Sequence, residues 1–153
     1  MEKEKTCKIV FSDIDGTLLT SDGQITEGTK EMILNLEKKG IPFILTSARS
    51  PEGVRVIKRM LGNHAPIIAF CGGLILDNDG NEIYSKMIPL KRALELKAML
   101  DKDFPAVACN TFGGEKWIVD DRDDWREQRE EKIVGFPAEI GSIKDTFETE
   151  GGI

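Results

Sequence analysis

The first half of the chain alternates short apolar runs with amphipathic segments, and this alternation is the feature that most limits the fold. Apolar runs occupy residues 8–11, 41–50 and 66–70, and segments with helical spacing lie between them at 26–40 and 50–62. A β-α-β rhythm of this kind predicts an α/β protein with a partial, doubly wound, Rossmann-like parallel sheet. The run at 8–11 is expected to be a strand that is buried on both faces.

The ends of the two expected helices carry recognisable capping residues. Thr26 precedes the first helix and Gly40 follows its basic last turn, whereas Ser50, Pro51 and Gly62 stand at the two ends of the second. Hydroxyl side chains are favoured at the N-cap, proline in the first turn and glycine after the last turn. These residues therefore predict both boundaries of each helix.

The rhythm changes after about Lys86, which indicates a second module. Residues 73–85 before it predict a hairpin around Asp79–Gly80, because that pair stands between two strand-like runs. We therefore divide the chain into residues 1–85 and residues 86–153. In the second part we expect a helix, a hairpin around Gly113–Gly114, a charged helix and a tail with no assigned element, at 89–103, 106–120, 120–133 and 135–153.

Composition excludes several classes of protein. A chain of 153 residues with 40% hydrophobic residues fits one globular domain or two small ones. A net charge of -6 argues against binding to nucleic acid or to anionic membranes. The apolar runs are too short for a signal peptide or a membrane span, so we expect a cytoplasmic protein. Three cysteines without a C-x-x-C spacing favour reduced thiols over disulfides or structural zinc.

Two aspartates one residue apart, Asp13 and Asp15, follow the first apolar run and lead into Gly16. A solvated turn is the simplest explanation of such acids. However, ligands of open α/β sheets bind outside the carboxyl ends of the strands, and the two acids are placed there. The position and the D-I-D-G-T-L-L spelling at 13–19 therefore favour a functional site.

This pair of acids suits the hydrolysis of a phosphate ester. Asp13 can act as the nucleophile and form an acyl phosphate, while Asp15 protonates the leaving oxygen and later accepts a proton from water. At 4 Å and an effective dielectric constant near 20, each pair of like unit charges costs roughly 4 kcal/mol. A divalent cation would remove this repulsion, and Mg²⁺ prefers oxygen ligands together with a substrate phosphate.

The D-I-D-G-T-L-L stretch resembles the first motif of the haloacid dehalogenase superfamily of phosphatases. This resemblance implies that Asp13 is the nucleophile and a Mg²⁺ ligand, and that Asp15 is the general acid/base whose backbone carbonyl also binds the metal. Ser47, in F-I-L-T-S-A-R-S, matches the hydroxyl residue of the second motif. Arg49 stands where the Cof-type branch has an arginine. Gly16, Ser47 and Arg49 are accordingly expected to bind the substrate phosphate.

The Cof-type branch also has an Asn-Gly pair after the third strand. The F-C-G-G stretch at 70–73 places Gly72 on that glycine, as a phosphate-binding residue, and Cys71 on the asparagine. Cys71 could instead be a nucleophile, but with no histidine near it in sequence we expect a buried small hydrophobic residue. The single histidine, His64, is expected to be a surface or structural residue.

The resemblance covers residues 1–85 as the N-terminal part of the core and 86–153 as part of an α+β cap. In Cof-type relatives the chain returns from the cap with a phosphate-binding lysine and a metal-binding acidic motif, and neither follows here. We therefore expect a truncated chain whose open sheet edge favours a homodimer, an exchange of elements between copies, or poor solubility. In the cap part, Phe112, Trp117 and Trp125 are expected in the core rather than in a pocket. The acids at 120–124 are expected to begin a solvated helix rather than bind a cation.

The sequence thus predicts a Mg²⁺-dependent phosphohydrolase that acts on a small phosphorylated metabolite, such as a sugar phosphate. A catalytically incomplete fragment of such an enzyme is the main alternative. A phospho-accepting receiver domain is the third interpretation. It is disfavoured because receivers place the phosphorylated aspartate after a later strand, whereas Asp13 follows the first.

Overall fold

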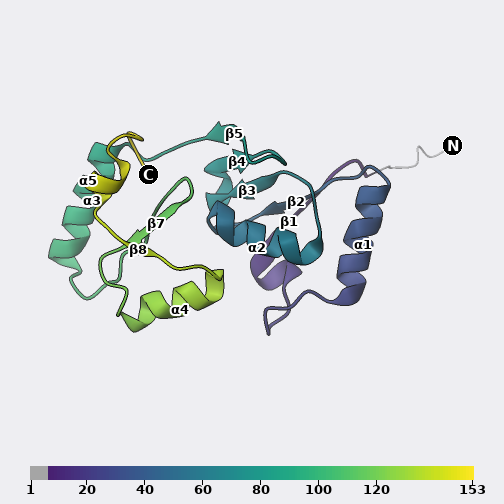
Figure 1. Cartoon of the computed structure of the whole chain (residues 1–153), viewed down its shortest axis with the longest axis horizontal. Coiled ribbons are helices and arrows are strands. Elements are labelled where there is room, and N and C mark those ends of the chain that lie inside the picture. Colours follow the sequence, from purple (N-terminus) through teal and green to yellow (C-terminus); the bar gives the residue numbers. More distant parts are fainter. Residues whose placement is uncertain (1–6) are drawn as a thin grey trace. The chain divides into compact units, whose positions relative to one another are not determined.

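The computed structural model describes residues 7–153, which form two compact units. Of the described residues, the first unit comprises 7–85 and the second comprises 86–153 (Figure 1). Each unit has its own sheet. Among the described residues, no helix has the length and apolar character that crossing a membrane requires.

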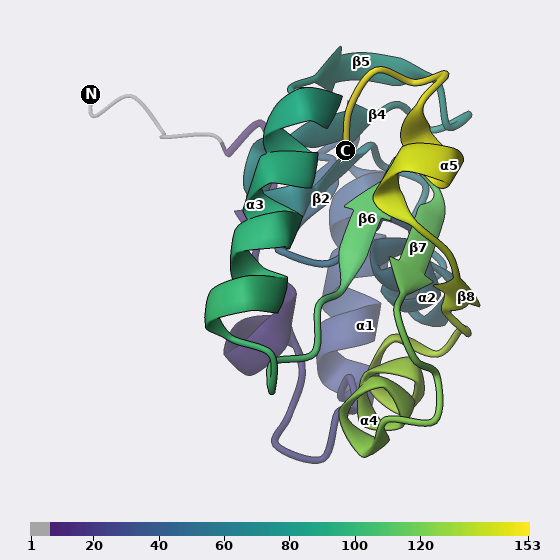
Figure 2. The ribbon, with the colours of Figure 1, turned by 90° about the vertical axis from the view of Figure 1, so that its left-hand side faces the viewer.

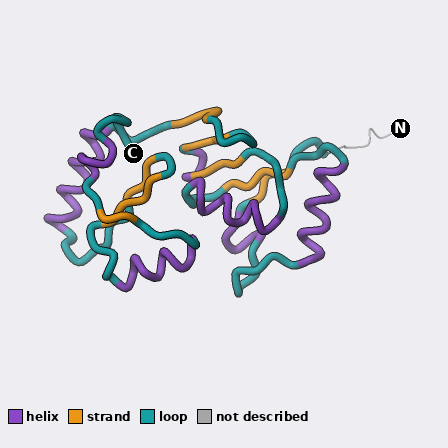
Figure 3. Tube along the Cα trace, in the orientation of Figure 1, coloured by secondary structure: helices purple, strands orange, loops and turns teal. Residues whose placement is uncertain are grey.

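A five-stranded sheet forms the centre of the first unit, with its strands in chain order. Strands β1, β2 and β3 are parallel, and β4 and β5 are each antiparallel to the strand before them. The sheet is therefore mixed rather than wholly parallel, since a hairpin extends its parallel part. Figure 3 shows the strands in orange. The strands are β1 (Val10–Ser12), β2 (Phe43–Thr46), β3 (Ile67–Ala69), β4 (Leu74–Leu76) and β5 (Glu82–Ser85).

Two helices, α1 (Glu27–Lys38) and α2 (Pro51–Leu61), connect the parallel strands, contact one another and pack on β2. Their predicted N-caps are confirmed. The hydroxyl of Thr26 accepts a hydrogen bond from the backbone N–H of Thr29 at 3.2 Å, and that of Ser50 accepts one from Gly53 at 3.4 Å. Gly62 ends α2 with a φ of 70°, a conformation that glycine adopts without strain.

The expectation that the first strand is buried on both faces is wrong. β1 pairs with β2 only, so it forms an edge of the described sheet. Ile9 is 44% exposed and Phe11 is 57% exposed, whereas Val10, on the opposite face, packs against the core. An apolar alternation shows where a strand lies, but it does not show whether a neighbouring strand or layer covers both faces.

The predicted hairpin at 73–85 is confirmed as β4 and β5. Its turn is organised by Asp77, whose carboxylate accepts hydrogen bonds from the backbone N–H groups of Asp79 and Asn81, each at 2.8 Å. Gly80 supplies the positive φ of 88° that this turn requires. Several short-range hydrogen bonds therefore fix the conformation of residues 77–81.

The second unit surrounds a three-stranded sheet in which β6 and β7 are antiparallel and β7 and β8 are parallel. Figure 2 shows β6 and β7 beside the helices α3 and α5, which contact each other. The predicted helices and the hairpin are present. The elements are α3 (Leu90–Asp103), β6 (Thr111–Gly113), β7 (Lys116–Val119), α4 (Trp125–Val134), β8 (Glu139–Ile140) and α5 (Ile143–Phe147).

Two expectations for the second unit need correction. The tail at 135–153, to which the sequence assigns no element, contributes β8 and α5, and Phe147 of α5 is completely buried. Trp117 is buried as expected, and Phe112 stacks on it with ring centroids 5.3 Å apart. Trp125 is 68% exposed at the start of α4 and is not part of the core.

Candidate active site

The loop after β1 exposes its two acids to solvent, while its apolar residues are buried. Ile14 and Leu18 are 0% and 9% exposed and insert into the core of the first unit, so Asp13 and Asp15 face solvent between and beside them. Gly16 has a φ of 74°, and a Cβ added there would meet no atom within 4 Å. The turn therefore needs glycine for its conformation rather than for space.

Ser47, the residue after β2, joins the neighbouring loops. Ser47 is 5% exposed, and its backbone N–H donates to the carbonyl of Ile68 at 3.0 Å. Its carbonyl accepts from the N–H of Cys71 at 2.9 Å, and its hydroxyl accepts from the N–H of Arg49 at 3.2 Å. The loops after β2 and β3 are consequently held together by backbone hydrogen bonds around Ser47.

Arg49 and Asp15 form a two-pronged ion pair. The Nε and Nη2 atoms of Arg49 donate to Oδ2 and Oδ1 of Asp15 at 2.9 Å and 2.7 Å. The arginine side chain is 12% exposed and the aspartate side chain is 58% exposed. This parallel geometry is the strong form of an arginine–carboxylate contact, and it also suits arginine to bind a phosphate. The sequence did not predict this pair.

The turn after β3 holds three successive residues at positive φ: Phe70 at 50°, Cys71 at 54° and Gly72 at 92°. Non-glycine residues rarely adopt this conformation, and such outliers gather at functional sites. The turn leaves Cys71 exposed, so the expectation that it is a buried hydrophobic residue is wrong. The F-C-G-G spelling was the only sequence signal for an unusual turn here.

The expected site residues thus follow three neighbouring parallel strands. Asp13, Asp15 and Gly16 lie after β1, Ser47 and Arg49 after β2, and Gly72 after β3. Carboxyl ends of parallel strands meet at one edge of a sheet, where ligands of this fold class bind. Within residues 7–153, direct contacts join Asp15 to Arg49 and Arg49 to Ser47. The carboxylate of Asp13 has no hydrogen-bond partner in that range, so it is available to a ligand.

The oxygen donors at this edge fit a magnesium ion that retains most of its water. In the described part of the chain, no cluster of three or more acidic, histidine or cysteine side chains is arranged to hold a metal. Mg²⁺ does not need such a cluster, because one or two carboxylates together with water and a substrate phosphate satisfy it. The Asp13 carboxylate and the Asp15 backbone carbonyl could hold it, since the Asp15 carboxylate is engaged by Arg49.

The mixed sheet with two helices between its parallel strands defines an α/β protein, a class that binds ligands at the carboxyl edge of its sheet. The family model for haloacid dehalogenase-like hydrolases matches residues 10–150, and the chain belongs to this family. A Haemophilus influenzae protein that carries a provisional phosphatase name is 36% identical over 124 residues, which are 75% of this chain and 47% of that protein.

Solved structures show the same fold. A haloacid dehalogenase-like hydrolase from Bacteroides thetaiotaomicron matches with a TM-score of 0.80 at 20% identity, over 90% of this chain and 52% of that one. A structure described as a HAD subclass IIB sugar phosphatase matches with a TM-score of 0.70 at 20% identity, over 90% of this chain and 54% of that one. The chain spans about half the length of the relatives that it matches.

Proposed function

We propose that this chain carries the nucleophile half of a Mg²⁺-dependent phosphohydrolase that acts on a small phosphorylated metabolite, such as a sugar phosphate. The observation that supports this proposal most directly is the free, exposed carboxylate of Asp13 at the carboxyl end of β1, beside the Asp15–Arg49 pair. Family membership and the phosphatase names of the relatives favour the same chemistry.

In the proposed reaction, a carboxylate oxygen of Asp13 attacks phosphorus and the ester oxygen leaves. Asp15 donates the proton that the leaving oxygen needs, so the products of this step are an alcohol and an aspartyl phosphate. A water molecule then attacks phosphorus, its proton returns to Asp15, and inorganic phosphate leaves Asp13 regenerated. Mg²⁺ would neutralise charge between Asp13 and the phosphate. The backbone around Gly16, Ser47 and Gly72 would surround the phosphate oxygens.

The Asp15–Arg49 pair suggests how substrate binding prepares the acid. Arg49 is almost buried and donates both prongs to Asp15, so a phosphate that enters the site competes with Asp15 for the same guanidinium. Transfer of Arg49 to the phosphate would release the Asp15 carboxyl for proton transfer. In this proposal Arg49 binds substrate and restrains Asp15 when substrate is absent.

The test is the hydrolysis of p-nitrophenyl phosphate by the full chain with and without Mg²⁺. We expect turnover to require Mg²⁺ and to fall at least about 10³-fold in Asp13→Asn, because the nucleophile is lost. Asp103→Asn at the end of α3 is the matched control and should leave turnover unchanged. Metal-independent turnover, or full turnover in Asp13→Asn, would reject the assignment.

The main alternative is a catalytically incomplete fragment, since relatives are about twice as long. Titration with beryllium fluoride and Mg²⁺, followed by ¹⁹F NMR, separates the two. A competent site should capture this phosphate mimic in the parent chain and lose it in Asp13→Asn. No capture by the parent chain would support the fragment.

The second unit and the sheet edge complete the proposal. We propose that residues 86–153 are part of a cap that helps to select substrate, and that the protein acts in the cytoplasm.

The exposed β1 edge, with Phe11 57% exposed, is a surface on which two copies could pair as a homodimer. Light scattering at increasing concentration should show a dimer, and a monomer throughout would contradict this part.

A further inference from the structure

A cavity lies in the first unit, at the opposite end of its sheet from the candidate active site. Its volume is about 610 Å³, and its lining includes Ile67, the first residue of β3, and Leu76, the last residue of β4. The acids Asp13 and Asp15 instead follow the carboxyl end of β1, which is parallel to its neighbour β2 and, through it, to β3. The two sites are therefore separate.

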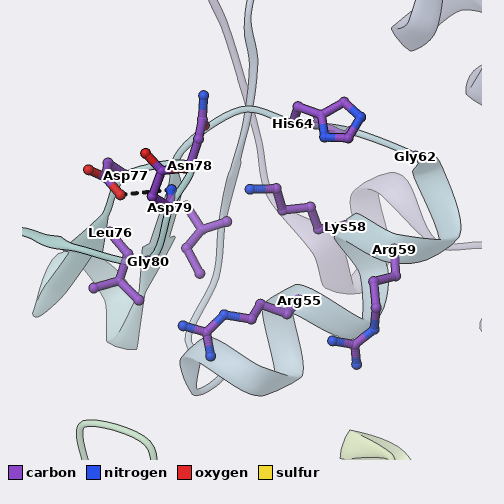
Figure 4. A pocket seen from close by; sticks show the side chains of 12 residues that line it. Arg55, Lys58, Arg59, Gly62, His64, Leu76, Asp77, Asn78, Asp79 and Gly80 are labelled. Atoms are coloured by element: carbon purple, nitrogen blue, oxygen red, sulfur yellow. Dashed lines mark hydrogen bonds between the residues drawn. The ribbon is translucent and has the colours of Figure 1, made fainter.

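Opposite walls of this cavity carry opposite charge. One wall is the second half of α2, which presents Arg55, Lys58 and Arg59, and the other is the hairpin turn with Asp77 and Asp79 (Figure 4). His64 and Asn63, on the loop after α2, line the space between the helix and β3. The chain as a whole has a net charge of -6, so a row of cations along one helix face is a local exception.

The two arginines on this face of α2 already have partners, whereas Lys58 has none among the described residues. Arg59 pairs with Glu52 at 2.7 Å, and Arg55 lies 3.6 Å from the same carboxylate. Within residues 7–153, no hydrogen bond or ion pair engages the ammonium group of Lys58, which is only partly exposed and points toward the hairpin turn (Figure 4). Burial, assisted by the charge of Arg55, lowers the pKa of Lys58. A bound anion would offset this cost of burying the charge.

On the facing wall, the carboxylate of one acid has hydrogen-bond partners and the carboxylate of the other has none among the described residues. The carboxylate of Asp77 is occupied by hydrogen bonds from Asp79, Asn81 and the Asn81 side chain. The carboxylate of Asp79 and the side-chain amide of Asn78 have no hydrogen-bond partner within the described residues. The groups that remain available are thus one cation and, across the cavity, acceptors for hydroxyl donors.

We propose that this cavity binds a small polyhydroxylated anion, with its carboxylate or phosphate on Lys58 and its hydroxyl groups on Asp79 and Asn78. A simple anion would satisfy Lys58 but would leave the acceptors of the hairpin turn facing its negative charge. An uncharged polyol would leave Lys58 unpaired. The volume of the cavity suits a ligand of sugar-acid or sugar-phosphate size.

The experiment is a titration of the full chain followed by ¹H–¹⁵N NMR. The probes are gluconate, glycerol 3-phosphate and acetate, the last being a carboxylate without hydroxyl groups. We expect gluconate or glycerol 3-phosphate to shift amides at 55–64 and 77–80, and acetate to shift them only at concentrations several-fold higher. Amide shifts confined to residues 13–17 and 47–49 would overturn the proposal. An affinity for acetate equal to that for gluconate or glycerol 3-phosphate would also overturn it.

Variants test the two walls separately. Lys58→Gln should weaken binding of the hydroxylated probe roughly tenfold, since a charge-assisted hydrogen bond is lost, and Lys58→Arg should restore most of the affinity. Lys38→Gln, an exposed lysine at the end of α1, is the matched control and should bind like the parent chain. Asp79→Ala should weaken the binding of gluconate but not the binding of acetate. Unchanged gluconate affinity in Lys58→Gln would contradict the proposed site, whatever the outcome for catalysis.

Discussion

The two units of the chain differ in how their cores are built. In the first, one continuous cluster of buried side chains from β2, β3, β4, the two helices and the loop after β1 packs against the sheet. In the second, the buried side chains form two smaller clusters, one with α3 and α5 and one around Trp117 and α4. The candidate catalytic residues all belong to the first unit.

This difference separates two ways of making a stable scaffold. A continuous core depends on the amount of apolar side chain that it buries, so truncating a side chain leaves a cavity. A small divided core depends more on close fits and on a few buried polar groups, so adding an atom or changing a charge matters there. Three substitutions, one in the continuous core and two in the divided core, test this contrast.

Leu45→Ala should produce the largest loss of stability. Leu45 lies in the middle of β2, is 1% exposed and belongs to the continuous cluster. Removing its buried methyl groups should lower the free energy of unfolding by about 2–5 kcal/mol. Chemical denaturation followed by circular dichroism measures the loss, and hydrogen exchange should place it in residues 8–85.

Leu96→Ala is the matched control, because Leu96 on α3 is 41% exposed. Its effect should be under about 0.5 kcal/mol, as for most surface substitutions. Equal losses in the two leucine variants would show that the continuous core of the first unit does not carry the stability that its burial indicates.

The strands and helices around Leu45 were largely predictable from the sequence, because local patterns encode them. Buried strands appear as short apolar runs, and Thr26, Ser50 and Gly62 mark helix ends by their own hydrogen-bonding and backbone preferences. The exposure of Phe11 was not predictable, since it depends on whether another element lies beyond β1. A strand pattern contains no information about its neighbours.

The candidate site was predictable to a similar degree. The motif placed Asp13 and Asp15 at a strand end, but the ion pair of Asp15 with Arg49 joins residues 34 apart in the chain. Neither that pair nor the positive φ of Phe70 follows from local propensity. Both depend on how neighbouring loops meet at the edge of the sheet, which only the folded chain determines.

Gly113→Ala should have the next largest effect, and it tests the close fit of the second unit. A Cβ at Gly113 of β6 would lie 2.5 Å from Cε1 and 2.8 Å from Cδ1 of Phe147, whose ring is completely buried. Overpacking of this kind should lower the free energy of unfolding by about 1–3 kcal/mol. Urea denaturation followed by tryptophan fluorescence measures this loss of stability, since Trp117 and Trp125 both belong to the second unit.

Gly28→Ala provides the matched control for this substitution. Gly28 lies in the first turn of α1, has no positive φ, and a Cβ there meets no atom within 4 Å. Alanine should therefore leave stability unchanged or raise it by up to about 1 kcal/mol. If Gly113→Ala were as stable as Gly28→Ala, then β6 and α5 would not be in the close contact that the structure shows.

The sequence did not predict β8 and α5, because their positions depend on the same tertiary packing that leaves no room for a Cβ at Gly113. β8 has two residues and α5 has five, so neither contains enough sequence for a periodic pattern. Tertiary contacts stabilise both elements, notably the burial of Phe147 beside Gly113. Short elements of this kind are determined by packing rather than by local propensity.

Glu127→Met should have the smallest effect of the three, and it should raise stability. Glu127 is 2% exposed on α4. Asn110 donates to its Oε1 at 3.3 Å, but among the described residues its buried Oε2 has no partner. Burial raises the pKa of Glu127 above the ordinary 4.5. Methionine has a similar size without the charge, so the free energy of unfolding at pH 7 should rise by about 1 kcal/mol.

The stability gain of Glu127→Met should depend on pH, whereas a gain from packing alone would not. A raised pKa means that the folded state holds the Glu127 proton more tightly than the unfolded state does. The parent chain therefore loses stability as the pH rises from 4.5 through the folded pKa, and the methionine variant lacks this loss. Urea denaturation from pH 4 to pH 8 should show the advantage of Glu127→Met growing with pH. Glu148→Met, at an exposed site, should show no such trend, and a pH-independent advantage would mean that Glu127 is not destabilised by its burial.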